Sequence, residues 1–207
     1  MGLKPKIMKK IIIALLIAST FVACEKEDTG NVSTITNYPV FTYNPIVIVP
    51  LNGTYEPDGI ATENGEEIPI TIDGAEDVNV NQVGIYNVTY TATNVDGFQG
   101  NASQTVIVHD PSIVGTDVSG NIRDKNNNAR KGVITLVEGT TSIFYCTDFG
   151  FAGSFPVYFQ MNGDIISEIP QSYINSVTSV ALTYDPNLLL FTTLISPYGF
   201  SYTFEYY

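Results

Sequence analysis

The sequence is poor in the residues from which most catalytic and metal sites are built. Its 207 residues include one histidine, two cysteines and no tryptophan. It has no glycine-rich phosphate loop, zinc-ligand spacing or nucleophile elbow. The single histidine, His109, follows a strand-like run and has one neighbouring acid but no nearby nucleophile, so we interpret it as a boundary residue. We therefore expect no catalytic residue, no metal site, no cofactor and no enzymatic activity, and a hydrolase is the least supported alternative.

Basic residues are also scarce, and their distribution is uneven. Nine Lys and Arg stand against 21 Asp and Glu, for a formal net charge of −12. None lies between Lys26 and Arg123, and the last four are Arg123, Lys125, Arg130 and Lys131. Nucleic-acid binding depends on cationic contacts to phosphate, and anionic membrane surfaces attract basic segments. The acidic balance argues against both partners, and solubility is its simplest explanation.

The longest apolar run, residues 11–22, is too short to span a membrane, which takes about 20 residues. Two lysines precede it and Ala23-Cys24 follows it, the pattern of a secretory signal. Residues 21–24, Phe-Val-Ala-Cys, resemble a lipobox, which implies that residues 1–23 are a lipoprotein signal peptide and that Cys24 is the lipidation site. The alternative is an ordinary signal peptide in which Cys24 is incidental. Met8 begins a more usual signal than Met1.

The residues after Cys24 indicate where in the cell the protein is located. Residues 25–28, Glu-Lys-Glu-Asp, resemble the signal that sends lipoproteins of the Bacteroidetes to the outer face of the outer membrane. The resemblance implies a lipid-anchored protein facing the cell exterior. Loss of four lysines with the signal peptide would lower the net charge from −12 to −16. Residues 24–37 are polar and aperiodic, and we expect a flexible tether. Cys146 would then have no partner, and its apolar run predicts a buried, inert thiol.

Residues 38–110 combine short β-rich runs with Gly, Pro, Asp and Asn turns, which predicts an antiparallel sandwich. In the clearest strand, residues 85–93, Tyr86, Val88, Tyr90 and Ala92 share one face. Three motifs stand at 55–61 (YEPDGIA), 83–94 (VGIYNVTYTATN) and 100–103 (GNAS), and a last strand at 105–108. They resemble the bacterial immunoglobulin-like (Ig-like) domain of an insecticidal crystal protein and of many surface proteins. Asn94 departs from the Asp usual there.

Two consequences follow from this part of the chain. The Gly84-x-Tyr86 spacing predicts a tyrosine corner, in which the Tyr86 hydroxyl returns to the backbone near the start of the strand. The resemblance implies a spacer or a binding scaffold, because such modules do not carry a fixed function.

Residues 113–207 predict a second antiparallel β-sandwich or a barrel-like domain. The strand candidates are 118–123, 132–137, 143–147, 155–161, 179–184, 188–195 and 199–206. Asn162-Gly163 predicts a type I′ hairpin turn, and residues 165–176 allow one helical turn. Residues 124–128 imitate half of a calcium loop but lack its Gly and Glu, so we predict a hairpin turn. The fold class is therefore all-β, and the two-domain arrangement resembles lipoproteins that accompany outer-membrane glycan-import systems.

Aromatic residues are the one abundant candidate for binding. The chain has 24 aromatic residues, 13 Tyr and 11 Phe, and 16 of them fall between Phe144 and Tyr207. Strict alternation from Tyr198 to Tyr206 places five of them on one sheet face, which favours core packing. Phe149, Phe151 and Tyr173 fall in apparent turns, and we predict them as ligand-binding residues because aromatic rings stack on sugars. The lack of tryptophan weakens a sugar site.

These observations favour a non-enzymatic, lipid-anchored binding protein at the cell surface. A glycan-binding accessory of an outer-membrane nutrient-import system is one form of it, with polysaccharide as the partner. The alternative is a structural, adhesion or assembly module whose partner is another surface protein.

Overall fold

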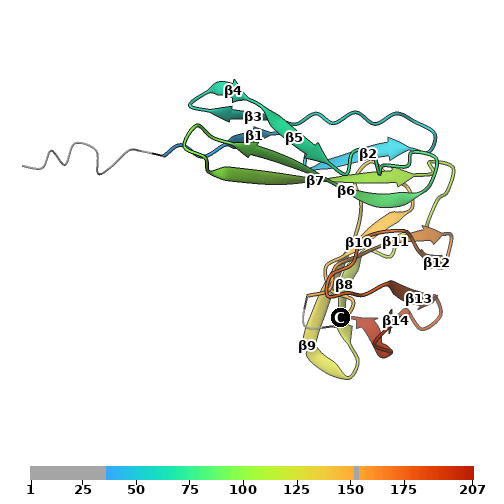
Figure 1. The fold of residues 1–207 in the computed structure, drawn as a ribbon. Coiled ribbons are helices and arrows are strands. Elements are labelled where there is room, and N and C mark those ends of the chain that lie inside the picture. The colour runs from blue at the N-terminus through green and yellow to red at the C-terminus, as the bar shows by residue number, and fades with distance from the viewer. Residues whose placement is uncertain (1–35, 152–153) are drawn as a thin grey trace, which may run out of the picture. The chain divides into compact units, whose positions relative to one another are not determined.

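The structure, a computed structural model, describes residues 36–151 and 154–207. Every regular element in these residues is a β-strand, so the predicted all-β fold class is confirmed (Figure 1). No helix in the described part is long and apolar enough to span a membrane. The predicted signal peptide, Cys24 and nearly all of the predicted tether lie outside the described residues.

The first seven strands form two sheets. They are β1 (Val40–Thr42), β2 (Ile46–Pro50), β3 (Ile60–Glu63), β4 (Glu66–Ile68), β5 (Ile70–Asp73), β6 (Gly84–Thr93) and β7 (Gln99–His109). One sheet has the order β1-β3-β4 and the other β2-β7-β6-β5, and only the β2–β7 pair is parallel. Along β6, Val88, Tyr90 and Ala92 are buried and Tyr86 is half-buried, so the predicted inward face of this strand is confirmed.

The predicted tyrosine corner is also present. The Tyr86 hydroxyl donates to the carbonyl oxygens of Asn79 at 3.1 Å and Gln82 at 3.3 Å, a few residues upstream. A side chain at Gly84 would lie 3.0 Å from this hydroxyl, so the glycine leaves room for the Tyr86 ring to fold back toward the backbone. The Gly-x-Tyr spacing therefore serves the geometry of the strand start.

The Pro57-Asp58-Gly59 turn is fixed by a buried polar network. Gln104, with no exposed surface, donates to the Asp58 carboxylate at 2.8 Å and accepts from the Tyr90 hydroxyl at 3.1 Å. Tyr55 donates to the same Gln104 oxygen at 2.5 Å. Each buried polar atom of this group thus has a partner, as burial in a low-dielectric core requires.

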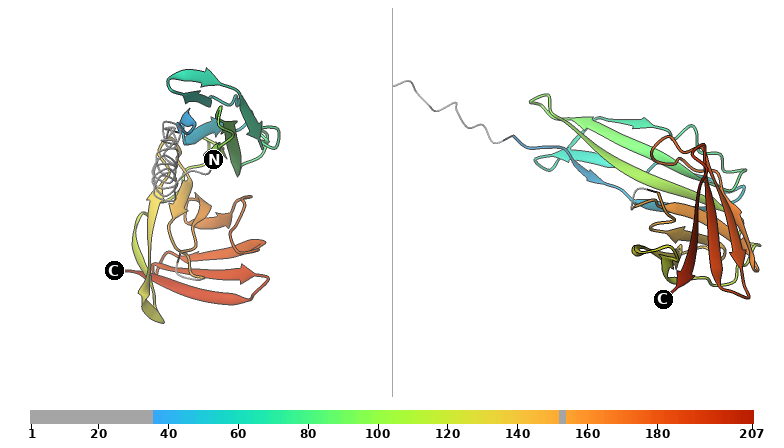
Figure 2. Two further views of the ribbon diagram at one scale, coloured as in Figure 1. Left: turned by 60° about the vertical axis from the view of Figure 1, so that its left-hand side comes forward. Right: turned by 90° about the horizontal axis from the view of Figure 1, so that it is seen from below.

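The last eight strands form one curved sheet. They are β8 (Gly120–Asp124), β9 (Asn127–Leu136), β10 (Ile143–Cys146), β11 (Val157–Asn162), β12 (Ile165–Glu168), β13 (Ser179–Asp185), β14 (Leu190–Ser196) and β15 (Phe200–Tyr206). The order is β12-β11-β10-β9-β8-β15-β14-β13, with all neighbours antiparallel. Figure 2 shows the sheet curving back on itself. Its two edges meet where the Val180 N–H donates to the Glu168 carboxylate at 3.2 Å, so the sheet is a nearly closed barrel.

One predicted hairpin turn is confirmed, a second hairpin has a different turn from the one predicted, and the predicted helical turn is wrong. Asp124 accepts from the Asn126 N–H at 2.9 Å and closes the β8–β9 turn. The β11–β12 turn consists of residues 163–164, because Asn162 still pairs with Ile165. Gly163 has a positive φ of 54° but Asp164 does not, so the type I′ turn predicted for Asn162-Gly163 is wrong. Residues 165–168 form β12 instead of a helical turn, because Ile166 alternates as the buried residue between exposed neighbours.

A further apolar cluster joins the two parts of the described chain. It contains Ile85 and Ile107 of the sandwich with Ile143 and Ile169 of the C-terminal half. The Ile85 N–H also donates to the carbonyl oxygen of Pro170 at 2.8 Å. Residues from Asn37 to Tyr207 accordingly form one compact unit.

Candidate functional site

Aromatic side chains fill the interior of the barrel. Phe149 has no exposed surface, and its ring lies 5.6–5.8 Å from the rings of Phe159, Phe191 and Phe204. A ring without an exposed face cannot stack on a sugar, so the assignment of Phe149 to a ligand site is corrected to a core role. Since side chains occupy the core, a ligand site on this barrel has to lie on its surface.

Four loops gather at one end of the barrel. Because neighbouring strands are antiparallel, the connections β8–β9, β10–β11, β12–β13 and β14–β15 emerge on the same side. Their described residues are 125–126, 147–151, 154–156, 169–178 and 197–199. We call this side the loop end. All three predicted ligand-binding residues belong to these loops, but Phe149 is buried, which leaves Phe151 and Tyr173 as candidates at the loop end.

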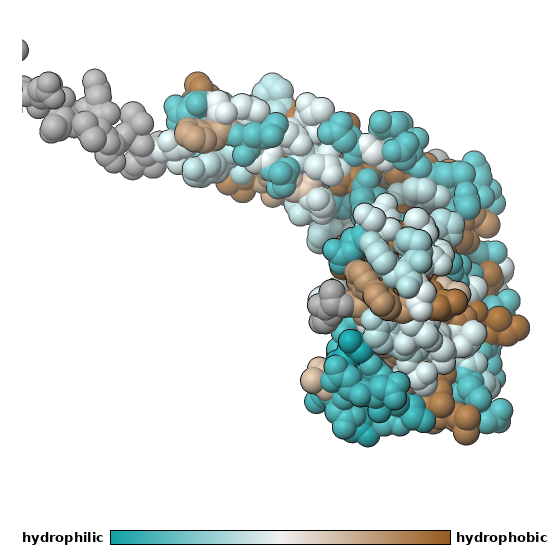
Figure 3. Space-filling view, turned by 60° about the horizontal axis from the view of Figure 1, so that its bottom comes forward, coloured by the Kyte–Doolittle hydropathy of each residue, from teal (hydrophilic) through white to brown (hydrophobic). Residues whose placement is uncertain are grey.

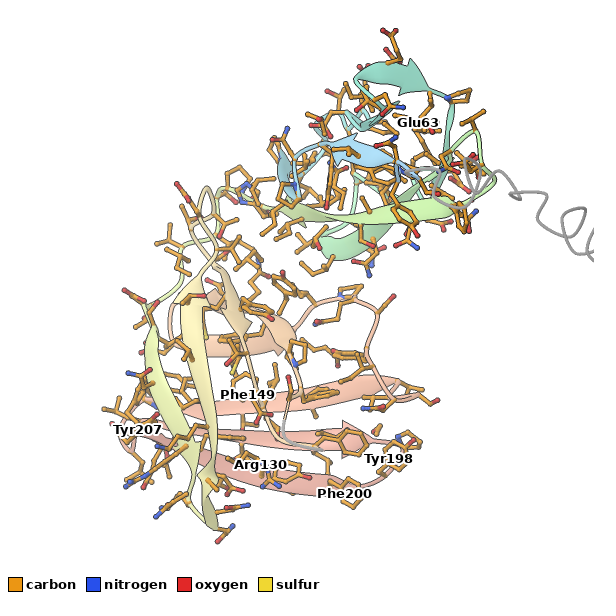
Figure 4. The ribbon with its side chains drawn as sticks, turned by 90° about the vertical axis from the view of Figure 1, so that its left-hand side faces the viewer. Glu63, Arg130, Phe149, Tyr198, Phe200 and Tyr207 are labelled. Atoms are coloured by element: carbon orange, nitrogen blue, oxygen red, sulfur yellow. The ribbon has the colours of Figure 1, made fainter. Side chains whose placement is uncertain are left out.

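Three rings at the loop end form a cluster on the surface. Phe151 stacks on Tyr198 at 5.3 Å between centroids, Tyr198 stacks on Phe200 at 5.8 Å, and Phe151 and Phe200 are 5.6 Å apart. Tyr198 and Phe200 are each 46% exposed, and Phe151 is half-buried. In Figure 4, Phe149 points into the space inside the curved sheet, whereas Tyr198 and Phe200 lie together at its margin. We call these three residues the aromatic cluster.

Asp148 fixes the loop that presents Phe151. Its carboxylate accepts from the backbone N–H of Gly150 at 2.9 Å and of Phe155 at 3.2 Å. Phe151 itself has a left-handed backbone with φ 69°, a strained conformation for a bulky residue. Gly150 is required before it, because a side chain there would lie 2.4 Å from the Tyr202 ring. These constraints hold the half-buried ring of Phe151 between the core and the rings of Tyr198 and Phe200.

A buried ionic group lies beneath this loop. Arg130 pairs with the buried Asp124, and its guanidinium stands 4.5 Å from the ring centroid of Tyr202. Burial raises the pKa of Asp148 above its ordinary value, while the two N–H donors and the charge of Arg130 oppose that rise. Figure 4 shows Arg130 on the same side of the barrel as Phe200. Arg130 thus reaches Tyr202, two residues from Phe200 along β15, with its charge paired to Asp124.

Tyr173 contacts the aromatic cluster indirectly, through Phe155. Its ring stacks on Phe155 at 6.0 Å, and Phe155 in turn contacts Phe151 at 5.8 Å. Its hydroxyl donates to Glu168 at 2.8 Å, and burial raises its pKa. The β12–β13 loop, which contains Tyr173, is also linked to the aromatic cluster, because the Tyr198 hydroxyl donates to the Asn175 carbonyl oxygen at 2.9 Å. The structure thus connects Tyr173 with Phe151 through Phe155, but leaves Phe149 apart.

The aromatic row on β15 leaves the core as it approaches the loop end. Phe204 is fully buried, and Tyr202 and Tyr206 pack against the core, as the alternation predicts. For Tyr198 and Phe200 the predicted core role is wrong, since both are largely exposed. Pro197 and Gly199 flank Tyr198 and mark a turn, which is the sequence signal that distinguishes these two rings.

A second concave surface is lined by residues of the barrel and by Ile46 of β2. Tyr145 and Tyr158 stand 4.8 Å apart and border a groove of about 390 Å³. Its other lining residues are Ile46, Thr135, Leu136, Val137 and Glu138. Figure 3 shows that exposed hydrophobic side chains on the visible face occur in several separate areas rather than in one broad surface. The groove is a second candidate for contact.

The residues considered for catalysis are both buried. Cys146 donates to the Asp148 carbonyl oxygen at 3.4 Å, and burial raises its pKa, which favours the unreactive thiol. Burial lowers the pKa of His109, and the negative charge of Asp110 opposes this shift. In the described ranges no group of three or more His, Cys, Asp or Glu could hold a metal ion.

Comparison with known proteins identifies one domain. Residues 42–108 match the family model of the bacterial surface protein Ig-like domain. The Ig-like domain expected from the motifs is therefore confirmed, whereas its insecticidal-protein type and a Bacteroidetes origin stay predictions. The chain is also similar to the crystal structure of a lipoprotein from Bacteroides thetaiotaomicron, with 22% identity, a TM-score of 0.41, and coverage of 81% of this chain and 98% of that chain. No curated protein matches the sequence.

Proposed function

We propose that this chain is a lipid-anchored binding protein of the bacterial outer surface, and that the aromatic cluster holds a glycan. Cys24 carries the lipid, the Ig-like domain acts as a spacer, and the C-terminal barrel presents the site. The match of residues 42–108 to a domain of bacterial surface proteins supports the location. The protein is not an enzyme in this proposal, and its activity is to retain a polysaccharide for an import system.

One observation carries the glycan assignment: three touching rings, from the β10–β11 loop, the β14–β15 turn and the start of β15, reach the surface of a barrel whose core is already filled. Rings packed only for stability would be buried, because burying a large apolar side chain stabilises a fold by roughly 1.5–3 kcal/mol. Neighbouring exposed rings instead mark a surface for contact. The apolar faces of sugar rings fit such a platform, and neighbouring hydroxyl groups can remain solvated.

Affinity electrophoresis through gels containing defined polysaccharides tests this proposal. Phe200→Ala should weaken retention by about tenfold, equivalent to 1.4 kcal/mol, the size expected for a central contact residue. Phe98→Ala is the matched control, because Phe98 is 47% exposed but belongs to the Ig-like part. Retention of a glycan that both variants leave unchanged would place the site elsewhere, and no retention across a broad glycan array would refute glycan binding.

A protein partner is the second candidate function. The groove beside Tyr145 and Tyr158 favours it, because exposed Ile46 and Leu136 contribute apolar surface there. Pull-down of a membrane protein that is lost with Tyr158→Ala but kept with Phe200→Ala would favour this candidate over the glycan.

A further inference from the structure

The four basic residues of the described chain all lie on one hairpin. Residues 36–207 contain 18 Asp and Glu but only Arg123, Lys125, Arg130 and Lys131 as cations. The structure places these four on β8, on β9 and in the turn between them. Everywhere else the described surface carries acidic charge alone, so this hairpin is the part of it that attracts anions.

The hairpin turn lies beside the strand that presents the aromatic cluster. The Lys125 N–H donates to the Thr203 carbonyl oxygen at 2.8 Å, three residues from Phe200 along β15. Arg130 stands over Tyr202, the next inward residue after Phe200. Tyr202 in turn packs against Gly150, which precedes Phe151. The turn that carries Lys125 therefore lies beside the strand that presents the aromatic cluster, and Lys131 lies farther from the cluster, level with Glu205.

Two of the four cations are available to a ligand. Arg123 pairs with Glu205 at 2.9 Å, and Arg130 pairs with Asp124. Within the part of the chain that the structure describes, Lys125 and Lys131 form no ion pair, and both are exposed. The Lys131 ammonium stands 4.8 Å from the Tyr207 ring centroid, so it is held at the surface beside an aromatic face.

We infer that the ligand is an anionic polysaccharide, one that bears carboxylate or sulfate groups. This inference rests on the proposed glycan-binding function and adds the chemical class. A sugar ring packs on the aromatic cluster, and acidic groups of the same chain reach Lys125 and, farther along the hairpin, Lys131. The acidic remainder of the protein does not prevent this, because charges farther away than about 8 Å are largely screened at physiological salt.

The test uses the mature protein and two polymers with one backbone, polygalacturonate and its methyl-esterified form. Wild-type protein should be retained at least about threefold more strongly by polygalacturonate at physiological salt, and the difference should disappear near 0.5 M NaCl. Lys125→Gln with Lys131→Gln should remove the preference and leave retention by the ester unchanged. Dextran sulfate against dextran repeats the comparison, and shows whether sulfate replaces carboxylate.

A control separates local attraction from net charge. Glu66→Gln with Glu67→Gln changes two exposed charges in the sandwich and leaves the hairpin intact, so it should leave the preference for polygalacturonate in place. Equal retention of both polymer forms, or a preference that survives the lysine substitutions, would overturn the inference. Retention of uncharged polymers that depends on Phe200 would in that case still support the proposed function. Loss of retention of every polymer would refute both.

Discussion

Asp148 is the residue on which the loop carrying Phe151 depends. Its carboxylate accepts two backbone N–H groups of that loop, and burial raises its pKa. A raised pKa means that the folded state binds a proton more tightly than the unfolded chain does. The contribution of Asp148 to stability is therefore complete below the ordinary pKa of 3.8 and is lost as the pH rises through the folded-state value.

Asp148→Asn should consequently be at least as stable as the wild type at pH 7. The amide oxygen can accept the same two N–H groups without placing a charge in the core. Thermal unfolding followed by circular dichroism between pH 3.5 and 7.5 should show the relative advantage of the variant growing as the pH rises.

Asp185→Asn is the matched control, because Asp185 also accepts two backbone N–H groups but lies at the surface. A variant at position 148 that is most destabilised at neutral pH would show that the charged carboxylate is needed, contrary to this account.

At the scale of the element, the turn before β3 determines how the sandwich closes. Gly59 lies against the ring of Tyr90, and an added side-chain carbon would stand 2.5–2.7 Å from three ring atoms. Tyr90 cannot move away, since it is fully buried and bonded to Gln104. The glycine of the turn is therefore a requirement of packing.

Gly59→Ala should destabilise the protein by about 1–3 kcal/mol, the usual cost of overpacking a filled core. Chemical denaturation should detect this as a lower midpoint with an unchanged slope. In a Tyr90→Leu background the ring is gone, and the same substitution should cost much less. Equal costs in both backgrounds would show that contact with Tyr90 is not the cause.

The strand β15 shows how one element serves two purposes. Its aromatic row packs into the core at Phe204 and reaches the surface at Phe200. Alternation along a strand specifies which face a side chain takes, but not where along the strand the neighbouring elements stop. The exposed end of the row is decided by the loops around it.

At the scale of the whole molecule, the proposed function requires attachment through Cys24. Cys24→Ala should abolish metabolic labelling with palmitate and release the protein from the membrane fraction. Cys146→Ala should keep the label, because this thiol has no exposed surface. Labelling that persists in Cys24→Ala would refute the lipoprotein assignment.

The same cells test the direction in which the protein faces. A protein on the outer face of the outer membrane should be degraded by protease added to intact cells. Protection until the outer membrane is broken would place it on the inner side.

The sequence by itself determined the fold class, the Ig-like domain and the tyrosine corner. These features depend on local alternation, turn residues and short spacings, which a chain carries wherever it folds. Only the tertiary structure decided which of the three predicted ligand residues are buried and which reach the surface. Phe149 and Phe151 are two positions apart, yet one fills the core and the other joins the surface cluster. Long-range pairing of β8 with β15 and the meeting of separate loops determine that difference, and neither leaves a signal in the local sequence.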